Sequence, residues 1–518
     1  MDGRLTDGMF RTVLIANRGE IACRIAATLR EMGIRSVAVA SEADRGALHT
    51  RRADDVRVIG PAEPRASYLD AEAILAAAKE TGAEAIHPGY GFLAENAGFA
   101  EAVERAGLVF IGPTAGQIRA MGDKRAARAI AVEAGVPVVP GGEGSDPAAL
   151  AKEAARIGYP VMVKAALGGG GKGMRVVRDG SELREAVESA QRVAASAFGD
   201  AAVYLEKVIE RPRHIEVQIV GDGHGGAIHL FERECSLQRR HQKVIEECPS
   251  AAVDEALRER ITFAAVALAK AVKYRGAGTM EFLLGPDGHF YFLEMNTRLQ
   301  VEHPVTEMVT GIDLVRLQVE VAATGRLSVA QTDVSRRGHA IEARIYAEDA
   351  ARNFLPQAGR ATRVRWPRAP FVRVDAGVVA GDPVPVHYDP ILSKVIAFGE
   401  DRPRALTRLT RALDESAVQG VVSNLPFLRA LVRARAVRDA AFDTEWIERE
   451  FLAGFAAVVL APAPELALAA AAIAEAMGLT RGGVVAPGSP ASAEANSAGR
   501  DPFAALGRWR QKGLDSHA

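Results

Sequence analysis

The 518-residue chain contains only three cysteines, Cys23, Cys235 and Cys248. Their number is odd and their spacing is not that of metal ligands, which argues against a disulfide framework and favours isolated thiols in a reducing compartment. The formal net charge is −1, so no excess of basic residues points to a nucleic acid or a membrane surface as a partner. Any anion site must therefore be local.

Long apolar runs are missing as well. The N-terminal residues 1–5 contain no apolar signal region. The apolar run from Phe451 to Leu460 is too short to span a bilayer and is followed by Pro462 and Pro464. We therefore expect a soluble, cytoplasmic protein with no membrane partner.

Two common nucleotide-binding motifs are not found in the context that they require. The strand expected at residues 12–16 is not followed by a G-x-G-x-x-G turn, so dinucleotide binding is not indicated there. The glycine-rich run at residues 168–173 contains no G-K-[ST], which excludes a Walker A loop. We find no long internal duplication.

The alternation of strand and helix signals predicts an α/β and α+β protein with several domains. From residue 11 to about 122, short apolar strands alternate with a helix at about 21–32, which is typical of a parallel sheet. A helix at about 124–134 leads into a second α/β region that ends near Gly325. A third region begins with the half-alternating strand 339–345, and an Ala-rich segment and a Gly/Pro/Ser-rich linker follow it.

Polar residues occupy every second position of one segment, namely Glu294, Asn296, Arg298, Gln300 and Glu302. In an extended segment, side chains at this spacing share one face. Two carboxylates, an amide and a guanidinium are too costly to bury unpaired, so the pattern predicts a metal, an anion or both. A solvated strand face with a surface ion pair would show the same spacing, and this alternative stays open on the spacing alone.

A hairpin is expected just before that segment, since residues 281–284 and 289–294 flank the β-turn sequence Gly285-Pro-Asp-Gly288. We expect Leu284 to pair with His289, which makes Glu281 a diagonal neighbour of Glu294, about 7–8 Å away. Both carboxylates would then reach shared Mg²⁺ ions, which nucleotide enzymes hold through oxygen ligands. A bulge in the hairpin would break this register.

The glycine run lies between two expected strands, 159–164 and 174–177. Consecutive glycines let backbone N–H groups approach an anion closely. Lys164 ends the apolar incoming strand and needs an anionic partner. The pattern favours a mobile flap over nucleotide phosphates, while a merely flexible surface hairpin is the alternative.

A basic segment runs from Arg233 to Lys243. Charge runs are usually solvated surface, so this signal is weak on its own. Lys243 and His241 share strand parity, so we expect them to face one site together. His214, just before another expected strand, is a similar case, although such a histidine is more often structural.

Together these segments identify the chain as similar to biotin carboxylases, which have the ATP-grasp fold. The resemblance covers about residues 11 to 450. It rests on Ile15-Ala-Asn-Arg-Gly-Glu-Ile-Ala22, Ile86-His-Pro-Gly-Tyr-Gly-Phe-Leu93, Met121-Gly-Asp-Lys124, the glycine flap, Arg239-Arg-His-Gln-Lys243 and residues 294–303. It implies a Rossmann-like pre-ATP-grasp domain at 11–123, an ATP-grasp domain at 124–325 with a glycine-rich lid at about 140–212, and a β-rich C-terminal domain at 335–450. Residues 451–518 would hold an Ala-rich helix, a linker and a tail.

The resemblance also implies a role for each matching residue. ATP would be held by Lys124, Lys164, Gly170, Gly171, Glu206, Lys207, Val208, His214 and His241. Two Mg²⁺ or Mn²⁺ ions would be held by Glu281, Glu294 and Asn296. Bicarbonate would lie on Lys243, Arg298, Gln300 and the backbone of Val301. Glu302 would act as general base, and Arg344 would stabilise the biotin enolate.

The implied reaction suits these residue types. ATP would phosphorylate bicarbonate to carboxyphosphate, a step that needs Mg²⁺ and cations against charge on the transferring phosphoryl group. Glu302 would take the bicarbonate proton, and we expect its neighbour Arg298 to keep it ionised. Arg344 would offer a permanent positive charge to the enolate.

The partners implied are a carrier for biotin, a carboxyltransferase subunit and a second copy of the chain. No Met-Lys-Met biotinylation motif occurs, so we expect no biotinyl lysine here and a carrier in trans, or else a truncated chain. The tail at Asp501–Arg510 looks like the start of the linker domain of methylcrotonyl- or geranyl-CoA carboxylase α-subunits. Alternatives are another single-copy ATP-grasp ligase, or a non-catalytic scaffold subunit.

Overall fold

The computed structural model describes residues 8–144, 146–165, 175–198 and 203–459, together with residues 469, 472 and 473. The chain divides into two compact units, Met1–Leu460 and Ala461–Ala518. The architecture that follows is that of the first unit. The expected glycine loop around Gly170 and Gly171, the linker and the tail lie outside the described residues.

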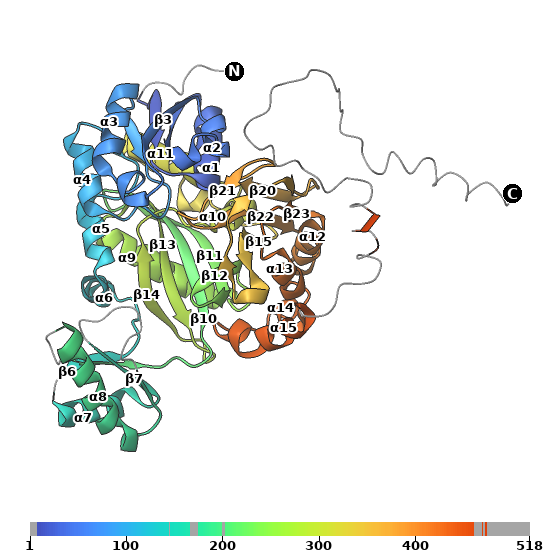
Figure 1. The fold of residues 1–518 in the computed structure, drawn as a ribbon. Coiled ribbons are helices and arrows are strands. Elements are labelled where there is room, and N and C mark those ends of the chain that lie inside the picture. The colour runs from blue at the N-terminus through green and yellow to red at the C-terminus, as the bar shows by residue number, and fades with distance from the viewer. Residues whose placement is uncertain are drawn as a thin grey trace, which may run out of the picture. The chain divides into compact units, whose positions relative to one another are not determined.

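The N-terminal part is a parallel five-stranded sheet in the order β3-β2-β1-β4-β5 (Figure 1). Its strands are β1 (Thr12–Ile15), β2 (Arg35–Ser41), β3 (Asp55–Gly60), β4 (Ala85–His87) and β5 (Val109–Phe110). Helices α1 (Gly19–Glu31), α2 (Leu48–Arg52), α3 (Ala71–Thr81), α4 (Ala97–Arg105) and α5 (Ala115–Gly122) connect and flank them. The expected parallel sheet is confirmed, although β3 was not predicted because charged residues alternate with its valines. The strand order reverses between β1 and β4, the place where open α/β sheets form crevices.

The centre of the molecule is an eight-stranded sheet in the order β14-β13-β10-β11-β12-β15-β22-β20. The strands are β10 (Arg213–Asp222), β11 (Ala227–Arg239), β12 (Gln242–Cys248), β13 (Arg275–Leu284), β14 (Phe290–Asn296), β15 (His339–Tyr346), β20 (Val372–Ala376) and β22 (Ile391–Gly399). Neighbours in this sheet are antiparallel. It joins strands that the sequence assigned to the ATP-grasp region and to the C-terminal region, whose exact limits stay predictions.

The faces of this sheet differ in composition. On β10, the buried Ile215, Val217 and Ile219 belong to a hydrophobic core that includes helix α9 (Glu255–Ala271). On β15 and β22, Ile341 and Val395 pack in a second core with α12 (Arg402–Glu415) and α13 (Leu425–Leu431). Polar side chains such as Glu216, Glu342 and Lys394 occupy alternate positions, so over these stretches the period of two separates a core face from a polar face.

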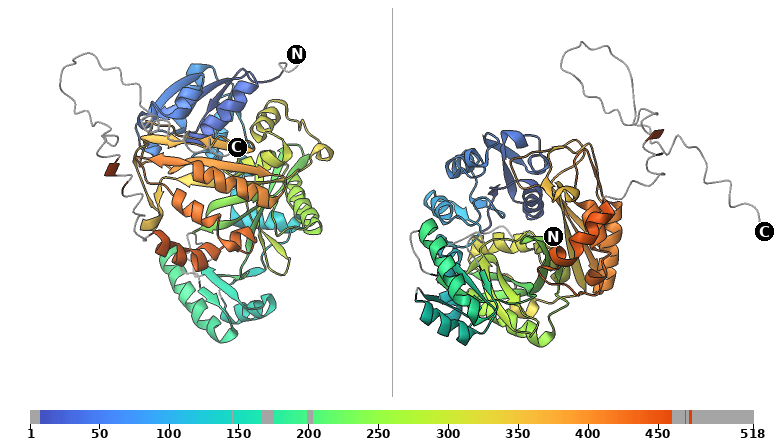
Figure 2. Two further views of the ribbon diagram at one scale, coloured as in Figure 1. Left: turned by 90° about the vertical axis from the view of Figure 1, so that its right-hand side faces the viewer. Right: turned by 60° about the horizontal axis from the view of Figure 1, so that its bottom comes forward.

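A smaller four-stranded sheet, in the order β6-β9-β7-β8, forms the expected lid region. Its strands are β6 (Gly141–Gly144), β7 (Val161–Ala165), β8 (Arg175–Val177) and β9 (Val203–Lys207), and its helices are α7 (Pro147–Ile157) and α8 (Gly180–Phe198). In the left view of Figure 2 these elements, in teal and green, lie together at the bottom, with the blue N-terminal sheet at the top. β7 and β8 pair antiparallel, as expected for the strands on either side of the glycine loop.

A helix can cross a membrane only if it is long and apolar enough. Within the described residues we find no helix that is both long enough and apolar enough to span a bilayer.

Candidate active site

A lysine ammonium stands at the centre of the polar face. Lys243 Nζ donates to Glu216 Oε2 at 2.6 Å, Glu281 Oε1 at 2.9 Å and Glu302 Oε1 at 2.6 Å. These carboxylates come from β10, from β13 and from the residue before helix α10 (His303–Thr310). Burial alone would lower the pKa of Lys243, but the carboxylates raise it well above its ordinary value, so the ammonium stays charged.

A bulge in β12 aims Lys243 at this site. Leu237 pairs with Ile245, but the next pair is Gln238 with Lys243, so Val244 is an extra residue in β12. Ile245 packs in the core beside α12. Because the bulge breaks the alternation, Lys243 does not follow Ile245 into that core.

The expectation that His241 and Lys243 share a strand face is wrong. Strand β12 begins at Gln242, and His241 lies in the turn between β11 and β12 with φ of 66° and an exposed side chain.

Behind the lysine, a fully buried arginine supports Glu216. Arg233 is 0% exposed, and its Nε lies 2.5 Å from Glu216 Oε1. Its other nitrogens donate to Gln218 Oε1, Thr306 Oγ1 and Thr279 Oγ1 at 2.7, 3.0 and 3.1 Å. With these partners, the guanidinium is satisfied without water.

Glu302 lies between two cations. Its Oε1 accepts from Lys243, and its Oε2 accepts from Arg344 at 2.9 Å. The carboxylate is 0% exposed, and burial alone would raise its pKa; Lys243, Arg344 and Arg233 outweigh burial and hold the pKa of Glu302 well below its usual range. Glu302 is therefore ionised, as expected from the sequence. The cations that keep it ionised are Lys243 and Arg344, and not the expected Arg298.

The alternating segment is a strand only in its first half. β14 ends at Asn296, and residues 297–302 form a bend and a turn that lead into α10. The expectation of one continuous strand face from Glu294 to Glu302 is therefore wrong. Alternate side chains still meet, because Arg298 donates to Asn296 Oδ1 at 3.0 Å and to Gln300 Oε1 at 3.2 Å.

The hairpin contains the bulge that would upset the expected register. Leu284 pairs with Phe290 instead of His289, and the register shifts between Glu281 and Phe282, so Leu293 is an extra residue in β14. Glu281 consequently lies directly opposite Glu294, closer than the diagonal arrangement predicted. The two carboxylates share one face, while Phe282 and Phe292 pack in the core.

The amides of the segment converge on Glu281. Asn296 Nδ2 donates to Glu281 Oε1 at 2.9 Å, and Gln300 Nε2 donates to the same oxygen at 3.2 Å. Burial raises the pKa of Glu281, but Lys243 and His214 outweigh it and the net pKa is lowered. An ionised carboxylate, a second carboxylate opposite and an amide oxygen form a donor set that suits a hard cation such as Mg²⁺.

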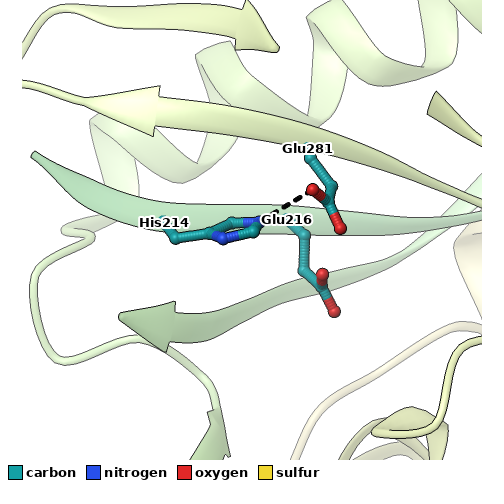
Figure 3. A group of neighbouring side chains, drawn as sticks. All are labelled: His214, Glu216 and Glu281. Carbon is teal, nitrogen blue, oxygen red and sulfur yellow. Dashed lines mark ion pairs between the residues drawn. The ribbon is translucent and has the colours of Figure 1, made fainter. Parts of the chain in front are cut away.

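A second possible ligand group overlaps this set. His214, Glu216 and Glu281 are buried and offer ligand atoms within 4.8 Å of one another (Figure 3). His214 Nε2 lies 3.1 Å from Glu281 Oε2. Burial lowers the pKa of His214, but the charge of Glu281 outweighs burial, so the net pKa lies above its usual value. A protonated His214 is a counter-ion for Glu281 and not a metal ligand.

The nucleotide residues expected from the lid cluster on β7 and β9. Lys164 Nζ lies 2.6 Å from Glu206 Oε2 across this strand pair. Lys207 Nζ instead donates to the carbonyls of Gly158 and Tyr159, and Val208 N donates to Pro160 O. Lys124, at the start of α6 (Lys124–Glu133), has its Nζ 3.7 Å from Glu294 Oε2 and is largely exposed.

A lysine that the sequence analysis missed contacts the segment 297–302. Lys394 on β22 is 0% exposed and donates to Val301 O at 2.8 Å. Its Nζ also lies 3.2 Å from Glu20 Oε1, and Glu20 accepts a hydrogen bond from Tyr90 OH. The N-terminal region thus reaches the site through Glu20 and Tyr90.

Glu216 and Arg233 were also missed as site residues. The signal was present, because His214, Glu216 and Gln218 interrupt an otherwise apolar strand at every second position. That is the same pattern that drew attention to residues 294–302, and it predicts a polar face opposite a core.

The parallel N-terminal sheet, the central antiparallel sheet with its paired carboxylates and the smaller sheet of the lid region together form an ATP-grasp architecture. Three family profiles match the chain: "Biotin carboxylase, N-terminal domain" over residues 9–118, "Carbamoyl-phosphate synthase L chain, ATP binding domain" over 123–330 and "Biotin carboxylase C-terminal domain" over 342–449. The chain belongs to the biotin carboxylase family, which confirms the resemblance drawn from its motifs.

Known relatives agree with this assignment. The biotin carboxylase of Pseudomonas aeruginosa is 50% identical over 85% of this chain and 99% of its own length. The mitochondrial methylcrotonoyl-CoA carboxylase subunit alpha of Mus musculus is 51% identical over 83% of this chain and 60% of its own length. The chain thus spans 60% of the length of the methylcrotonoyl-CoA carboxylase subunits that it matches.

Among solved structures, a biotin carboxylase complex with an ATP analogue from Campylobacter jejuni has a TM-score of 0.79 and 44% identity, covering 86% of this chain and all of that one. The biotin carboxylase domain of a thermophilic 2-oxoglutarate carboxylase bound to bicarbonate has a TM-score of 0.81 and 42% identity, covering 85% and 98%. The fold of this chain is therefore similar to both over most of its length.

Proposed function

We propose that this chain carboxylates biotin at the expense of ATP and bicarbonate, the first half-reaction of a biotin-dependent carboxylase. One observation carries the proposal: Lys243, Glu302 and Arg344 form a continuous charged group directly beside the paired carboxylates Glu281 and Glu294. The group offers cations for an anion, a carboxylate base and an adjacent donor set for a metal. A solved relative that contains ADP with magnesium and bicarbonate supports the choice of ligands.

ATP would bind to residues of the lid and of the neighbouring central part of the molecule. We assign ATP to Lys124, Lys164, Glu206, Lys207, Val208, His214 and His241, and to Gly170 and Gly171, which lie outside the described residues. Mg²⁺, or Mn²⁺ in its place, would be held by Glu281, Glu294 and Asn296, whose oxygens suit either ion. The metal would neutralise charge on the phosphates when bound.

Bicarbonate would enter beside Lys243, Arg298, Gln300 and the Val301 backbone. Arg298 is anchored by Glu95, whose Oε2 accepts from its Nε at 2.8 Å, so the guanidinium has a fixed position before bicarbonate binds. Lys243 and Arg298 would place the anion against Glu302, which would accept the bicarbonate proton as it attacks the phosphoryl group. The low pKa of Glu302 means that bicarbonate or biotin must draw a cation away from it before it becomes an effective base.

Arg344 would stabilise the biotin enolate, because its guanidinium keeps a full charge beside Glu302. Burial lowers the pKa of Arg344, but Glu246, Glu302 and other neighbours raise it well above its usual range. We propose that biotin arrives on a carrier protein or domain in trans and that a carboxyltransferase subunit takes the carboxyl group. A homodimer and a cytoplasmic location complete the proposal.

Free biotin provides the direct test. Purified protein with Mg²⁺ should hydrolyse ATP only when bicarbonate is present, and biotin should increase that rate and become carboxylated from labelled bicarbonate. Both ADP release and label incorporation should be measured in the same samples. Bicarbonate-independent ATP hydrolysis that ignores biotin would show that the proposal is wrong.

The metal assignment predicts a selective effect for Glu294→Gln. Glu294 is 41% exposed and lies outside the buried network, so its loss should leave the fold intact. The Mg²⁺ concentration for half-maximal activity should rise by at least about tenfold, the effect of losing even an outer-shell partner. Asp287→Asn, in the exposed turn of the same hairpin, is the matched control. An unchanged Mg²⁺ requirement in Glu294→Gln would exclude Glu294 as a ligand.

A further inference from the structure

Two buried glutamates face each other beside Arg344, the residue proposed to stabilise the biotin enolate. Glu246 on β12 and Glu342 on β15 are opposite residues of an antiparallel strand pair, and the two strands lie side by side in Figure 1. Both side chains are 0% exposed. Opposite residues in such a pair have Cβ atoms about 4.5–5.5 Å apart. Two ionised carboxylates at that spacing, without water, repel each other, so one of them is expected to hold a proton.

Glu342 is the member without a counter-ion in contact. Neither of its oxygens has a hydrogen-bond partner among the described residues. The nearest candidate cation is Lys394 on the neighbouring strand, but its ammonium already contacts Val301 O and Glu20. Burial raises the pKa of Glu342 well above its usual value; Lys394 and Arg344 lower it only in part, and Glu246 and Glu302 raise it again.

The oxygens of Glu246 likewise have no hydrogen-bond partner among the described residues, but Glu246 forms an ion pair with Arg344. Its Oε1 lies 2.5 Å from Arg344 Nε, while Arg344 NH2 donates to Glu302 Oε2 at 2.9 Å. One edge of the guanidinium therefore faces Glu246, and another nitrogen faces the reacting site. Burial raises the pKa of Glu246 to about 7, with Arg344 and Lys243 lowering it and Glu302 and Glu216 raising it.

We propose that Glu342 is kept as a neutral carboxylic acid and that Glu246, ionised beside it, is the positioning residue that orients Arg344. The neutral acid would leave Glu246 as the single anion of the pair, so Arg344 Nε has one partner and a fixed orientation. The contact through Nε leaves the terminal nitrogens of Arg344 to Glu302 and to an incoming anion. Only the identity of that anion, the biotin enolate, rests on the proposed function.

The arrangement gives the site a pH dependence with a definite sign. Glu246 becomes neutral as the pH falls through about 7, and it then releases Arg344 Nε. The carboxylation of biotin should therefore lose rate on the acid side of that pH. Bicarbonate-dependent ATP hydrolysis without biotin should not show the same limb, because Lys243 and Glu302 keep their charges there.

Infrared difference spectroscopy tests the neutral acid without any activity. Spectra of the wild-type protein at a series of pH values should contain a carbonyl band of a protonated, buried carboxylic acid at neutral pH, and Glu342→Gln should remove it. Glu232→Gln is the matched control, because Glu232 is equally buried but receives three hydrogen bonds from Arg258. Absence of the band in the wild-type protein at neutral pH, or its persistence in Glu342→Gln, would overturn the proposal.

Kinetics test the positioning role. Glu246→Gln should lower the rate of biotin carboxylation by about tenfold to a hundredfold, as expected for a misplaced catalytic group, and should abolish the acid limb near neutral pH. Glu246→Asp, which keeps the charge, should restore part of the rate and a shifted limb. A Glu246→Gln profile that keeps the wild-type limb would exclude Glu246 as its source.

The infrared and the activity measurements distinguish a failure of this inference from a failure of the proposed function. If the wild-type protein does not carboxylate biotin but shows the band that Glu342→Gln removes, the proposed function is wrong and the neutral acid stands. If the wild-type protein carboxylates biotin and the band is missing, the inference is wrong and the proposed function stands. Absence of the band from the wild-type protein overturns the inference even where a variant fails to fold.

Discussion

Arg344→Ala is expected to abolish the carboxylation of biotin while bicarbonate-dependent ATP hydrolysis continues. Arg344 contacts Glu302 and Glu246. The proposed metal ligands Glu281 and Glu294 and the Lys243 ammonium do not depend on Arg344 for a hydrogen bond. Loss of a charge that acts on the developing enolate should cost about a hundredfold to a thousandfold in the biotin reaction. Removal of Arg344 should also raise the pKa of Glu302, because one of its two cations is gone, and a more basic Glu302 favours the bicarbonate step.

Both rates should be measured with the same enzyme sample, as ADP release without biotin and as label transfer to biotin. Arg402→Ala is the matched control, since Arg402 forms a comparably buried ion pair with Glu247, the next residue of β12, on the core side of the sheet. It should lower stability without separating the two rates. Equal loss of both reactions in Arg344→Ala would contradict the role assigned to Arg344.

Lys243→Gln is expected to remove both reactions together. Its ammonium is the common partner of Glu216, Glu281 and Glu302, which belong to the metal side and to the bicarbonate side of the site. The variant should lose about a hundredfold to a thousandfold in bicarbonate-dependent ATP hydrolysis. Lys243→Arg keeps the charge and should retain more activity than Lys243→Gln. A variant that loses only the biotin step would contradict this account.

The charge of Lys243 should also affect how the free energy of unfolding depends on pH. In the wild-type protein the pKa values of Glu281 and Glu302 are depressed, so their contribution is present above the unfolded-state pKa and is lost only in strong acid. Without Lys243 their pKa values rise, so the variant should lose part of the stability that the wild-type protein gains as the pH rises through the unfolded-state pKa. Breaking a buried ion pair costs about 3–5 kcal/mol. Thermal unfolding of Lys243→Gln at acidic and alkaline pH checks the sign.

Much of the fold followed from short-range patterns. The apolar strands of the N-terminal sheet, the turn at Gly285–Gly288 and the strand pair around the glycine loop were predicted because each depends on local periodicity or turn chemistry. β3 was not, because Arg57 and Asp55 make it resemble a polar loop. Its pairing with the exposed side of β2 is a tertiary effect that local sequence does not encode.

The site was predicted in its residues more than in its geometry. Glu281 and Glu294 lie together as expected, but through a bulge at Leu293 that no sequence rule announced. The bulge at Val244 likewise decides where Lys243 points. The partners of Glu302 come from β12 and β15, about 60 and 40 positions away, so spacing within one segment led to the nearer Arg298 instead.

The pairing of β12 with β15 has a practical consequence for anyone who would dissect or recombine this protein. A cut near residue 335 would follow the expected domain border, yet it would separate two neighbouring strands in the middle of an eight-stranded sheet. Each fragment would then present a long unpaired edge, which promotes aggregation. Exchange of segments between related enzymes should therefore keep residues 213–399 from a single parent.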